Sequence, residues 1–397
     1  MTVYIIIQII LLILFSLATA YILVFALAGL FYKEKLYGTP ARFRKAAVLI
    51  PGYKEDAVIA EVAAAALKQQ YPQGLFDVVI IADSFQPATI EQLKMIPVKL
   101  IEVSFDKSTK SKALNKAMEQ LGDAYEIAVV LDADNIMAPD FLSKVNAAFD
   151  HGFIAVQGHR TAKNINNSWA VLDAVSEEIN NHIFRKGHRV LGLSSAIIGS
   201  GMAFEYSFFK TMMSSVHAVG GFDKEIELKM LKQRVKIAYL DYAFVYDEKI
   251  QQSEVFSNQR RRWLSAQVHY FRHGFTDAFK DLLTKGNADY FDKAIQFIQP
   301  PRVLLLGAVV LLSVIFISLN YFLHAGLVYS LTWLVVVAAC IAALLLSVPR
   351  IHYNARTLAA VAGLPKGMLL MLRSLLKIKG ANKTFIHTKH TAHSNSI

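Results

Sequence analysis

Long apolar runs at three places in the chain contrast with a middle section of much shorter apolar segments. The first run, from 3 to 31, consists almost entirely of Ile, Leu, Val, Ala and Phe, and two further runs cover 303–323 and 327–348. Each has at least the roughly 20 residues that an α-helix needs to cross a bilayer. The later two are joined by the short link NYFLHAG. The pattern predicts an N-terminal transmembrane anchor over 1–32 and a transmembrane hairpin over 302–349.

The middle section alternates short apolar strands with segments of helical spacing. Strands are expected at 46–50, 77–82, 98–103, 127–131 and 154–156, and helices at 56–70 and 111–121. This alternation predicts an α/β domain over 45–272, with a mostly parallel sheet covered by helices on both faces. In such domains the ligand site lies at the carboxyl ends of the strands. Polar residues directly after the strands are therefore the first candidates for chemistry.

Two further segments mix apolar and charged residues at helical spacing. The segment 273–301 ends at a Pro-Pro pair, and the segment 364–379 reads LPKGMLLMLRSLLKIK within a basic tail over 350–397. Both patterns are typical of helices that lie in the membrane interface. For 273–301, an ordinary amphipathic helix packed on the α/β domain remains the alternative.

Basic residues are concentrated beside the apolar runs. The 397-residue chain has a formal net charge of +11, and 54% of its residues are hydrophobic. Lys and Arg cluster at 33–45 and again at 350–397, where no Asp or Glu occurs. Because basic flanks remain on the cytoplasmic side, we expect an inner-membrane protein with its N-terminus outside and its middle domain and C-terminus cytoplasmic.

The same charge pattern disfavours two other classes of protein. A nucleic-acid binder should carry basic and aromatic residues interleaved over one broad face, whereas here the basic residues adjoin the membrane segments. A transporter should carry charged residues within its spans to mark an ion path. The three apolar runs contain no Asp, Glu, Lys or Arg. Cys340 is the single cysteine, so the chain has no intrachain disulfide.

Acidic residues follow two of the predicted strands. The strand 127–131 runs directly into Asp132 and Asp134, and another strand is followed by Asp83. Two carboxylates at one strand end can hold Mg²⁺ or Mn²⁺, with phosphate oxygens and water completing the shell. A turn that merely favours Asp is the alternative. No G-x-G-x-x-G follows the first strand and no P-loop motif occurs, which disfavours dinucleotide oxidoreductases and P-loop NTPases.

Several motifs together resemble those of a known family. They are PGYKED after the first strand, Asp83, KSKALN at 110–115, DAD at 132–134, GGFDKEIELKML at 220–231 and QRRRW at 259–263. Their order and spacing resemble the membrane-bound family 2 glycosyltransferases, relatives of cellulose, hyaluronan and poly-N-acetylglucosamine synthases and of ceramide glucosyltransferase. The resemblance covers about 45–270. It implies a GT-A fold and inverting transfer from a nucleotide-sugar, most commonly a UDP-sugar.

The resemblance also assigns donor and acceptor residues. The donor site would comprise Tyr53, Glu55, Asp83, Lys110, Asp132, Asp134, Gln259 and Arg262. Of these, Asp132 and Asp134 would hold the metal on the diphosphate. Trp263 and the loop of Gly199, Ser200 and Gly201 would face the acceptor, although the two glycines also suit a tight turn. Independently, a divalent ion and an Arg both stabilise the negative charge that grows on a leaving diphosphate, and a Trp face packs on a sugar ring.

An inverting transfer also needs a base, and here the chain departs from the family pattern. The family places an Asp two residues before a Glu-Leu pair, and this position is Glu225. A Glu can act as a base but reaches about one methylene further. Lys224 occupies the position of the preceding family acid. Asp223, Glu227, Asp247 and Glu248 are alternatives, each of which could instead be a helix-face or capping carboxylate.

Taken together, these features favour a membrane glycosyltransferase in cell-envelope or exopolysaccharide synthesis. Three spans are too few to enclose a polysaccharide channel, which favours a lipid-linked or membrane-associated glycan acceptor. A processive synthase with partner subunits for export is the first alternative. A non-catalytic membrane scaffold that keeps the fold is the second: Lys-Glu in place of the family's acidic pair favours it, whereas the intact DAD and QRRRW motifs disfavour it.

Overall fold

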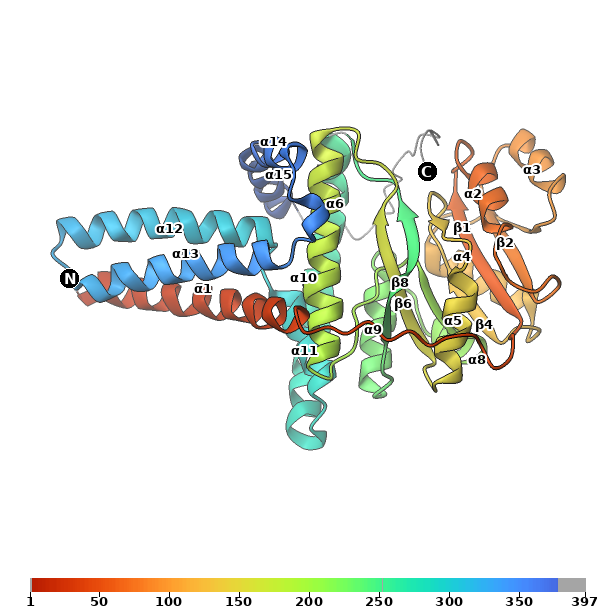
Figure 1. Ribbon diagram of the computed structural model, residues 1–397, viewed down its shortest axis with the longest axis horizontal. Coiled ribbons are helices and arrows are strands. Elements are labelled where there is room, and N and C mark those ends of the chain that lie inside the picture. The colour runs from red at the N-terminus through yellow and green to blue at the C-terminus, as the bar shows by residue number, and fades with distance from the viewer. Residues whose placement is uncertain (1, 252, 378–397) are drawn as a thin grey trace.

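The computed structural model describes residues 2–251 and 253–377, and it leaves the side chains of 253–255 undescribed. Three long helices extend from one side of an α/β domain, and a layer of further helices lies between the two (Figure 1). The last part of the predicted basic tail, 378–397, lies outside the described residues.

An eight-stranded sheet forms the centre of the domain, in the order β3-β2-β1-β4-β7-β6-β8-β5. The strands are β1 (Ala46–Tyr53), β2 (Phe76–Asp83), β3 (Lys99–Val103), β4 (Ile127–Val130), β5 (Ile136–Met137), β6 (Ala155–Ala162), β7 (Met202–Glu205) and β8 (Ala238–Asp247). The half β3-β2-β1-β4 is parallel, as expected, whereas β7 pairs antiparallel with both β4 and β6. The pair β6–β8 is also parallel, so most neighbouring strands run parallel as expected, and the sheet is mixed because β7, which the sequence pattern does not predict, and the short β5 pair antiparallel.

Helices cover both faces of this sheet. One face carries α2 (Ile59–Ala66), α3 (Pro87–Lys94) and α5 (Phe141–Asp150), and the other carries α4 (Lys110–Leu121), α8 (Tyr206–Ser214) and α9 (Phe222–Lys232). Along β1, Ala47 and Leu49 belong to one core, and Val48 and Ile50 belong to the other. This alternation follows from the two-residue period of a strand.

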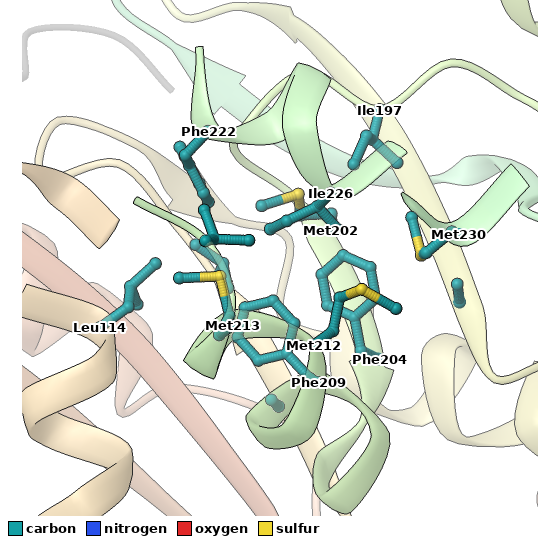
Figure 2. Close-up of a cluster of buried hydrophobic side chains, with 14 of the residues drawn as sticks. Leu114, Ile197, Met202, Phe204, Phe209, Met212, Met213, Phe222, Ile226 and Met230 are labelled. Carbon is teal, nitrogen blue, oxygen red and sulfur yellow. The ribbon is translucent and has the colours of Figure 1, made fainter. Parts of the chain in front are cut away.

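Methionine and phenylalanine side chains fill the core on the α8 and α9 face. Figure 2 shows Met202 and Phe204 from β7 among Phe209 and Met213 of α8 and Ile226 of α9. The rings of Phe204 and Phe209 stack with centroids 4.5 Å apart. This packing fixes the start of α9 against the sheet, and that helix carries several candidate catalytic acids.

A helical column stands between the sheet and the long apolar helices (Figure 1). It consists of α6 (Ser168–Asn180), the π-helix η1 (Asn181–Gly187) and the short α7 (His188–Val190). The column packs against α1 (Thr2–Gly29). There the ring of Phe25 stacks on His188 at 3.6 Å. π-Helical turns occur often at functional sites, and η1 contributes residues to the cavity described below.

The segment expected to form interface helices has a different layout. Helix α10 (Ser253–Lys285) is continuous across the domain boundary predicted between 272 and 273, and α11 (Ala288–Ile298) follows it. Tyr290, Ala294 and Phe297 of α11 are buried in the same core as α9. The alternative of a helix packed on the domain therefore describes α11, while Leu283 near the end of α10 is 70% exposed.

The predicted apolar spans are present as helices. In addition to α1, α12 (Arg302–Phe322) and α13 (Leu327–Leu346) are long and apolar enough to cross a membrane. After the short 3-10 helix η2 (Arg350–His352), α14 (Ala355–Val361) and α15 (Leu364–Leu376) form a pair bent by 48° that would count as a fourth span if continuous. Helix α14 contacts α6, and α15 contacts α10 and α12.

Candidate functional site

A cavity of about 390 Å³ lies where the end of β4 meets α4, α9, α10, α11 and η1. Its lining includes five residues expected in the donor and acceptor sites: Lys110, Asp132, Gly199, Arg262 and Trp263. These residues are distributed over more than 150 positions of the sequence. The fold therefore brings motifs that are distant in the sequence to one enclosed space.

Lys110 connects two walls of this cavity. Helix α4 begins at Lys110, and the side chain of the preceding Thr109 caps it by accepting a hydrogen bond from the Lys112 N–H at 3.2 Å. The Lys110 ammonium contacts a carboxylate oxygen of Asp132 and donates to the Gly199 carbonyl at 2.8 Å. Asp132 follows β4, and its N–H donates to Ser200 Oγ at 2.9 Å. An ion pair thus marks the carboxyl end of β4, where the sequence predicts the donor.

The two acids of the DAD motif have different surroundings. The Asp132 side chain is 37% exposed and lines the cavity, whereas Asp134 is 6% exposed and is not among the described residues that line it. No group of three or more His, Cys, Asp or Glu residues forms a metal cage within the described part of the chain. Two carboxylates one residue apart fit a divalent ion that takes its remaining ligands from phosphate and water. These two carboxylates suit a metal ion that binds together with the nucleotide-sugar.

Tyr53 and Asp83 lie side by side at the ends of β1 and β2. They are register partners, and the Lys54 N–H donates to the Asp83 carbonyl at 3.1 Å. Lys54 and Ser84 have φ values of 55° and 59°, so each strand ends in a left-handed turn that non-glycine residues seldom adopt. Asp83 is 2% exposed and accepts from Ser84 Oγ at 2.9 Å. This pair and Glu55 lie at the carboxyl ends of the strands, and none of the three is among the described residues that line the cavity.

The sequence pattern does not predict a group of buried charged residues at one wall of the cavity. Glu177 of α6 accepts from Arg160 of β6 at 2.8 Å, and it lies 3.5 Å from Arg185 of η1 and 3.7 Å from Lys249. Burial alone would raise the pKa of Glu177, but the charges of Arg160, Lys249 and Arg185 lower it. Arg160, Glu177 and Arg185 all line the cavity. Arg160 lies beyond the predicted strand 154–156, and only the observed length of β6 places it in a buried strand, where a charged residue needs a partner.

Helix α10 closes the cavity with Arg262 and Trp263. Burial lowers the pKa of Arg262, and the nearby charge of Asp132 acts in the opposite direction. Arg260 lies 4.4 Å from the centre of the Trp263 ring and pairs with Asp173 at 2.6 Å. Gln259, expected in the donor site, is not among the described residues that line the cavity. The arginine run thus holds Trp263 in place and supplies one cation to the site.

The acids of α9 are divided between two sides of the helix. Asp223 and Glu227 line the cavity, together with Lys224. Glu225, the expected base, is not among the described lining residues, and its carboxylate pairs with Lys229 at 2.8 Å. The structure therefore does not bring Glu225 to the cavity.

The remaining alternative acids and the expected acceptor loop also have defined places. Asp247 is partly buried, with its side chain 14% exposed; it lies 2.7 Å from Lys249, and Asn135 donates to it at 2.9 Å. It is absent from the described lining, as is Glu248.

Of the expected acceptor loop, Gly199 lines the cavity, while the fully buried Ser200 binds Asn135 behind it. Gly201 has a φ of 63°, so its glycine is needed for the turn into β7.

Sequence comparisons place the chain in a known family. The sequence model of the family described as "Glycosyltransferase like family 2" matches residues 44–266, more than half of the chain. A stretch of 124 residues is 27% identical to a glucans biosynthesis glucosyltransferase H of Rhodopseudomonas palustris (strain TIE-1). That match covers 28% of this chain and 17% of the relative, so the chain spans only a small part of its length.

One solved structure shows the same fold. A mannosyltransferase from Pyrobaculum calidifontis, in complex with GDP-Man and Mn²⁺, superposes with a TM-score of 0.51 at 17% identity, covering 85% of this chain and 97% of that one. S. aureus TarS 1-349, in complex with UDP-GlcNAc, has a TM-score of 0.41 at 14% identity, over 85% and 91% of the two chains. The predicted GT-A fold is confirmed, and the chain belongs to glycosyltransferase family 2.

Proposed function

We propose that this family 2 glycosyltransferase is bound to the inner membrane and transfers a sugar from a nucleotide-sugar, most simply a UDP-sugar, to a lipid-linked or membrane-associated glycan acceptor, with inversion at the sugar. Such a reaction belongs to cell-envelope or exopolysaccharide synthesis. The observation that carries the proposal is the meeting of Lys110, Asp132 and Arg262 in one cavity beside the long apolar helices.

The donor would extend from the sheet edge into the cavity. Tyr53, Glu55 and Asp83 would contact the base and ribose, because they lie at the ends of β1, which pairs with β4, and of β2, which pairs with β1. Lys110 and Arg262 would then bind the diphosphate, since both are cations on the cavity wall. A Mg²⁺ or Mn²⁺ ion held by Asp132 and Asp134 would supply further positive charge to the leaving diphosphate. GDP-Man and Mn²⁺ in the Pyrobaculum mannosyltransferase support this class of donor.

The acceptor would occupy the side of the cavity formed by η1, α10 and α11. Trp263 is 37% exposed and offers a flat apolar face against which a sugar ring can pack. Phe184 of η1 and Phe297 of α11 also line this side. Helix α1 packs on η1, and its Tyr21 hydroxyl donates to Asp292 of α11 at 2.7 Å. This direct attachment to an apolar span supports a membrane acceptor.

The deciding experiment measures nucleotide release and sugar transfer by the detergent-purified chain. A panel of UDP- and GDP-sugars is supplied with membrane lipid extract, with Mn²⁺, with Mg²⁺ or with EDTA. We expect one donor to be cleaved in a metal-dependent manner. Asp132→Ala should lower the rate by at least about 100-fold, because it removes a carboxylate from the diphosphate site. Asp140→Ala is the matched control, since Asp140, at the start of α5, pairs with Lys144 at 2.7 Å and is not among the described residues that line the cavity.

Two results would redirect the proposal. Full activity of Asp132→Ala in EDTA would contradict the metal-assisted diphosphate site. Donor binding without turnover under every condition would favour the alternatives, either a processive synthase that needs partner subunits or a scaffold that keeps the fold. Products longer than one added sugar would distinguish processive synthesis from single transfer.

A further inference from the structure

The acids of α9 are not equivalent, and their positions single out one of them for proton transfer. Accepting the proposed transfer reaction as its basis, we propose that Asp223, not Glu225, is the catalytic base that takes the proton of the acceptor hydroxyl. Asp223 lines the cavity, in the first turn of a helix that begins at Phe222. Two features favour Asp223: the face of α9 that meets the cavity and the partners of each carboxylate.

Asp223 lies next to the residues that mark the donor site. A methyl group added at Gly199 would lie 3.8 Å from both Cβ and Cγ of Asp223. The carbonyl of this same Gly199 accepts a hydrogen bond from Lys110 at 2.8 Å, and Lys110 contacts Asp132. A single residue therefore separates the Asp223 carboxylate from the ion pair at the end of β4. This position suits a base that must reach a hydroxyl at the sugar carbon.

Helix geometry explains why Glu225 does not share this position. Successive residues of an α-helix are about 100° apart, so Glu225 is turned by about 200° from Asp223. Its carboxylate pairs with Lys229 one turn further along, at 2.8 Å. Glu227 is four residues from Asp223 and returns to the same side. The presence of Asp223 and Glu227 in the described lining, without Glu225, matches this periodicity.

Glu227 shares the cavity wall but is engaged in holding α11. It is 3% exposed, pairs with Lys293 at 2.7 Å and accepts from the Ile197 N–H at 3.3 Å. Lys293 also donates to Gln296 of α11 at 2.5 Å. By contrast, the ion contact of Asp223 with its neighbour Lys224 is 3.8 Å long, beyond hydrogen-bond distance. Asp223 is therefore the cavity acid whose carboxylate is less committed to a structural pair.

The proposed step balances with groups already named. The acceptor hydroxyl oxygen forms a bond to the anomeric carbon of the donor sugar as the bond from that carbon to the diphosphate breaks. The electron pair of the broken bond leaves with the nucleoside diphosphate, close to Lys110 and Arg262. The hydroxyl proton passes to a carboxylate oxygen of Asp223, which releases it to water after the product departs. No oxidant or reductant takes part.

The test compares Asp223→Asn with Glu225→Gln, two changes that each replace a carboxylate by an amide of the same size. The donor is the nucleotide-sugar that the wild type cleaves with membrane lipid extract. We expect Asp223→Asn to bind this donor normally by calorimetry and to lose transfer by about 10²- to 10⁴-fold. Glu225→Gln should keep transfer near the wild-type rate, because its partner Lys229 lies outside the described cavity lining.

Every result has a defined reading. Transfer by Asp223→Asn at the wild-type rate would overturn the assignment, and loss in Glu225→Gln alone would restore the base expected from the family pattern. If Asp223→Asn fails to bind donor, Asp223→Ser is measured in the same way. Loss of transfer with donor binding retained would then support the assignment, and transfer at the wild-type rate would overturn it. Failure of the proposed function looks different: the wild type itself would then cleave no donor, and the comparison of variants would not arise.

Discussion

His159 shows how a single buried residue couples stability to pH. Its Nδ1 lies 2.7 Å from Asp241 of β8, and its Nε2 lies 3.1 Å from Glu178 of α6. Burial on its own would lower the pKa of His159, but the hydrogen bonds and charges of Asp241 and Glu178 raise it to about 9. Lys186 of η1 also pairs with Asp241, at 2.7 Å. The charged His159 ring therefore connects β8 of the sheet with α6 of the helical column beside the cavity.

The sign of the resulting pH dependence follows from the raised pKa. Because the folded state holds the proton more tightly than an ordinary histidine near 6.5, this contribution is fully present below pH 6.5 and is lost as pH rises toward 9. It amounts to about 3 kcal/mol. We expect the melting temperature of the wild type to fall over this range and that of His159→Gln to fall much less. Equal slopes in differential scanning fluorimetry would contradict this role.

At the residue scale, the sequence predicts the motif residues better than their supporting partners. Lys110, Asp132 and Arg262 were predicted because each belongs to a motif with a fixed spacing, and the structure brings them together. Arg160 and Arg185 were not predicted, because the pattern predicts a strand only to residue 156 and no π-helix at 181–187, so it does not place either arginine beside Glu177. Of these residues, Asp132 is the one whose proposed role the transfer assay above tests.

Among the elements, α1 and η1 form a close contact between the apolar helices and the cavity. A methyl group at Gly187 of η1 would overlap the carbonyl oxygen of Phe25 and lie 2.9 Å from its carbonyl carbon. The neighbouring η1 residues Phe184 and Arg185 line the cavity. Since a backbone atom cannot move aside as a flexible side chain can, a substitution here must displace one helix from the other.

We therefore expect Gly187→Ala to destabilise the protein by about 1–3 kcal/mol and to reduce sugar transfer. The loss of activity should exceed any loss of donor binding, because η1 lies on the acceptor side of the cavity. Gly367→Ala is the matched control: this α15 glycine has only the Trp169 ring near the added methyl, at 3.9 Å. Melting temperature, donor affinity and transfer rate are measured for both, and equal effects of the two changes would contradict the proposed link.

The accuracy of the element predictions depends on how local each signal is. Strands β1, β2 and β4 were predicted within a few residues, because each is a buried apolar run with a polar end. Strand β7 was missed because its four residues follow a glycine turn that resembles a loop. The π-helix η1 has no sequence signature. Helix α10 continues through Gly274, where packing against Leu228 outweighs the low helix propensity of glycine.

For the whole molecule, the three apolar helices form a bundle with two distinct ends. At the far end, the Tyr4 hydroxyl of α1 donates to Asn320 of α12 at 2.6 Å. At the near end, Tyr21 of the same helix binds Asp292 in the helical layer beside the cavity. Figure 1 shows the link between α12 and α13 at the end of the bundle away from the sheet. A membrane crossed by these three helices would therefore have the α/β domain on one side and the α12–α13 link on the other.

Which side faces the cytoplasm is testable by cysteine labelling in intact bacteria. The native Cys340 is fully buried and provides a silent background. His324→Cys in the α12–α13 link and Glu102→Cys at the domain surface place one exposed thiol on each side. Because the basic clusters adjoin the domain end of the bundle, a membrane-impermeant maleimide should label position 324 in intact cells and position 102 only after permeabilisation. The reverse labelling would place the catalytic domain outside, away from cytoplasmic nucleotide-sugars, and would contradict the proposed reaction together with the topology.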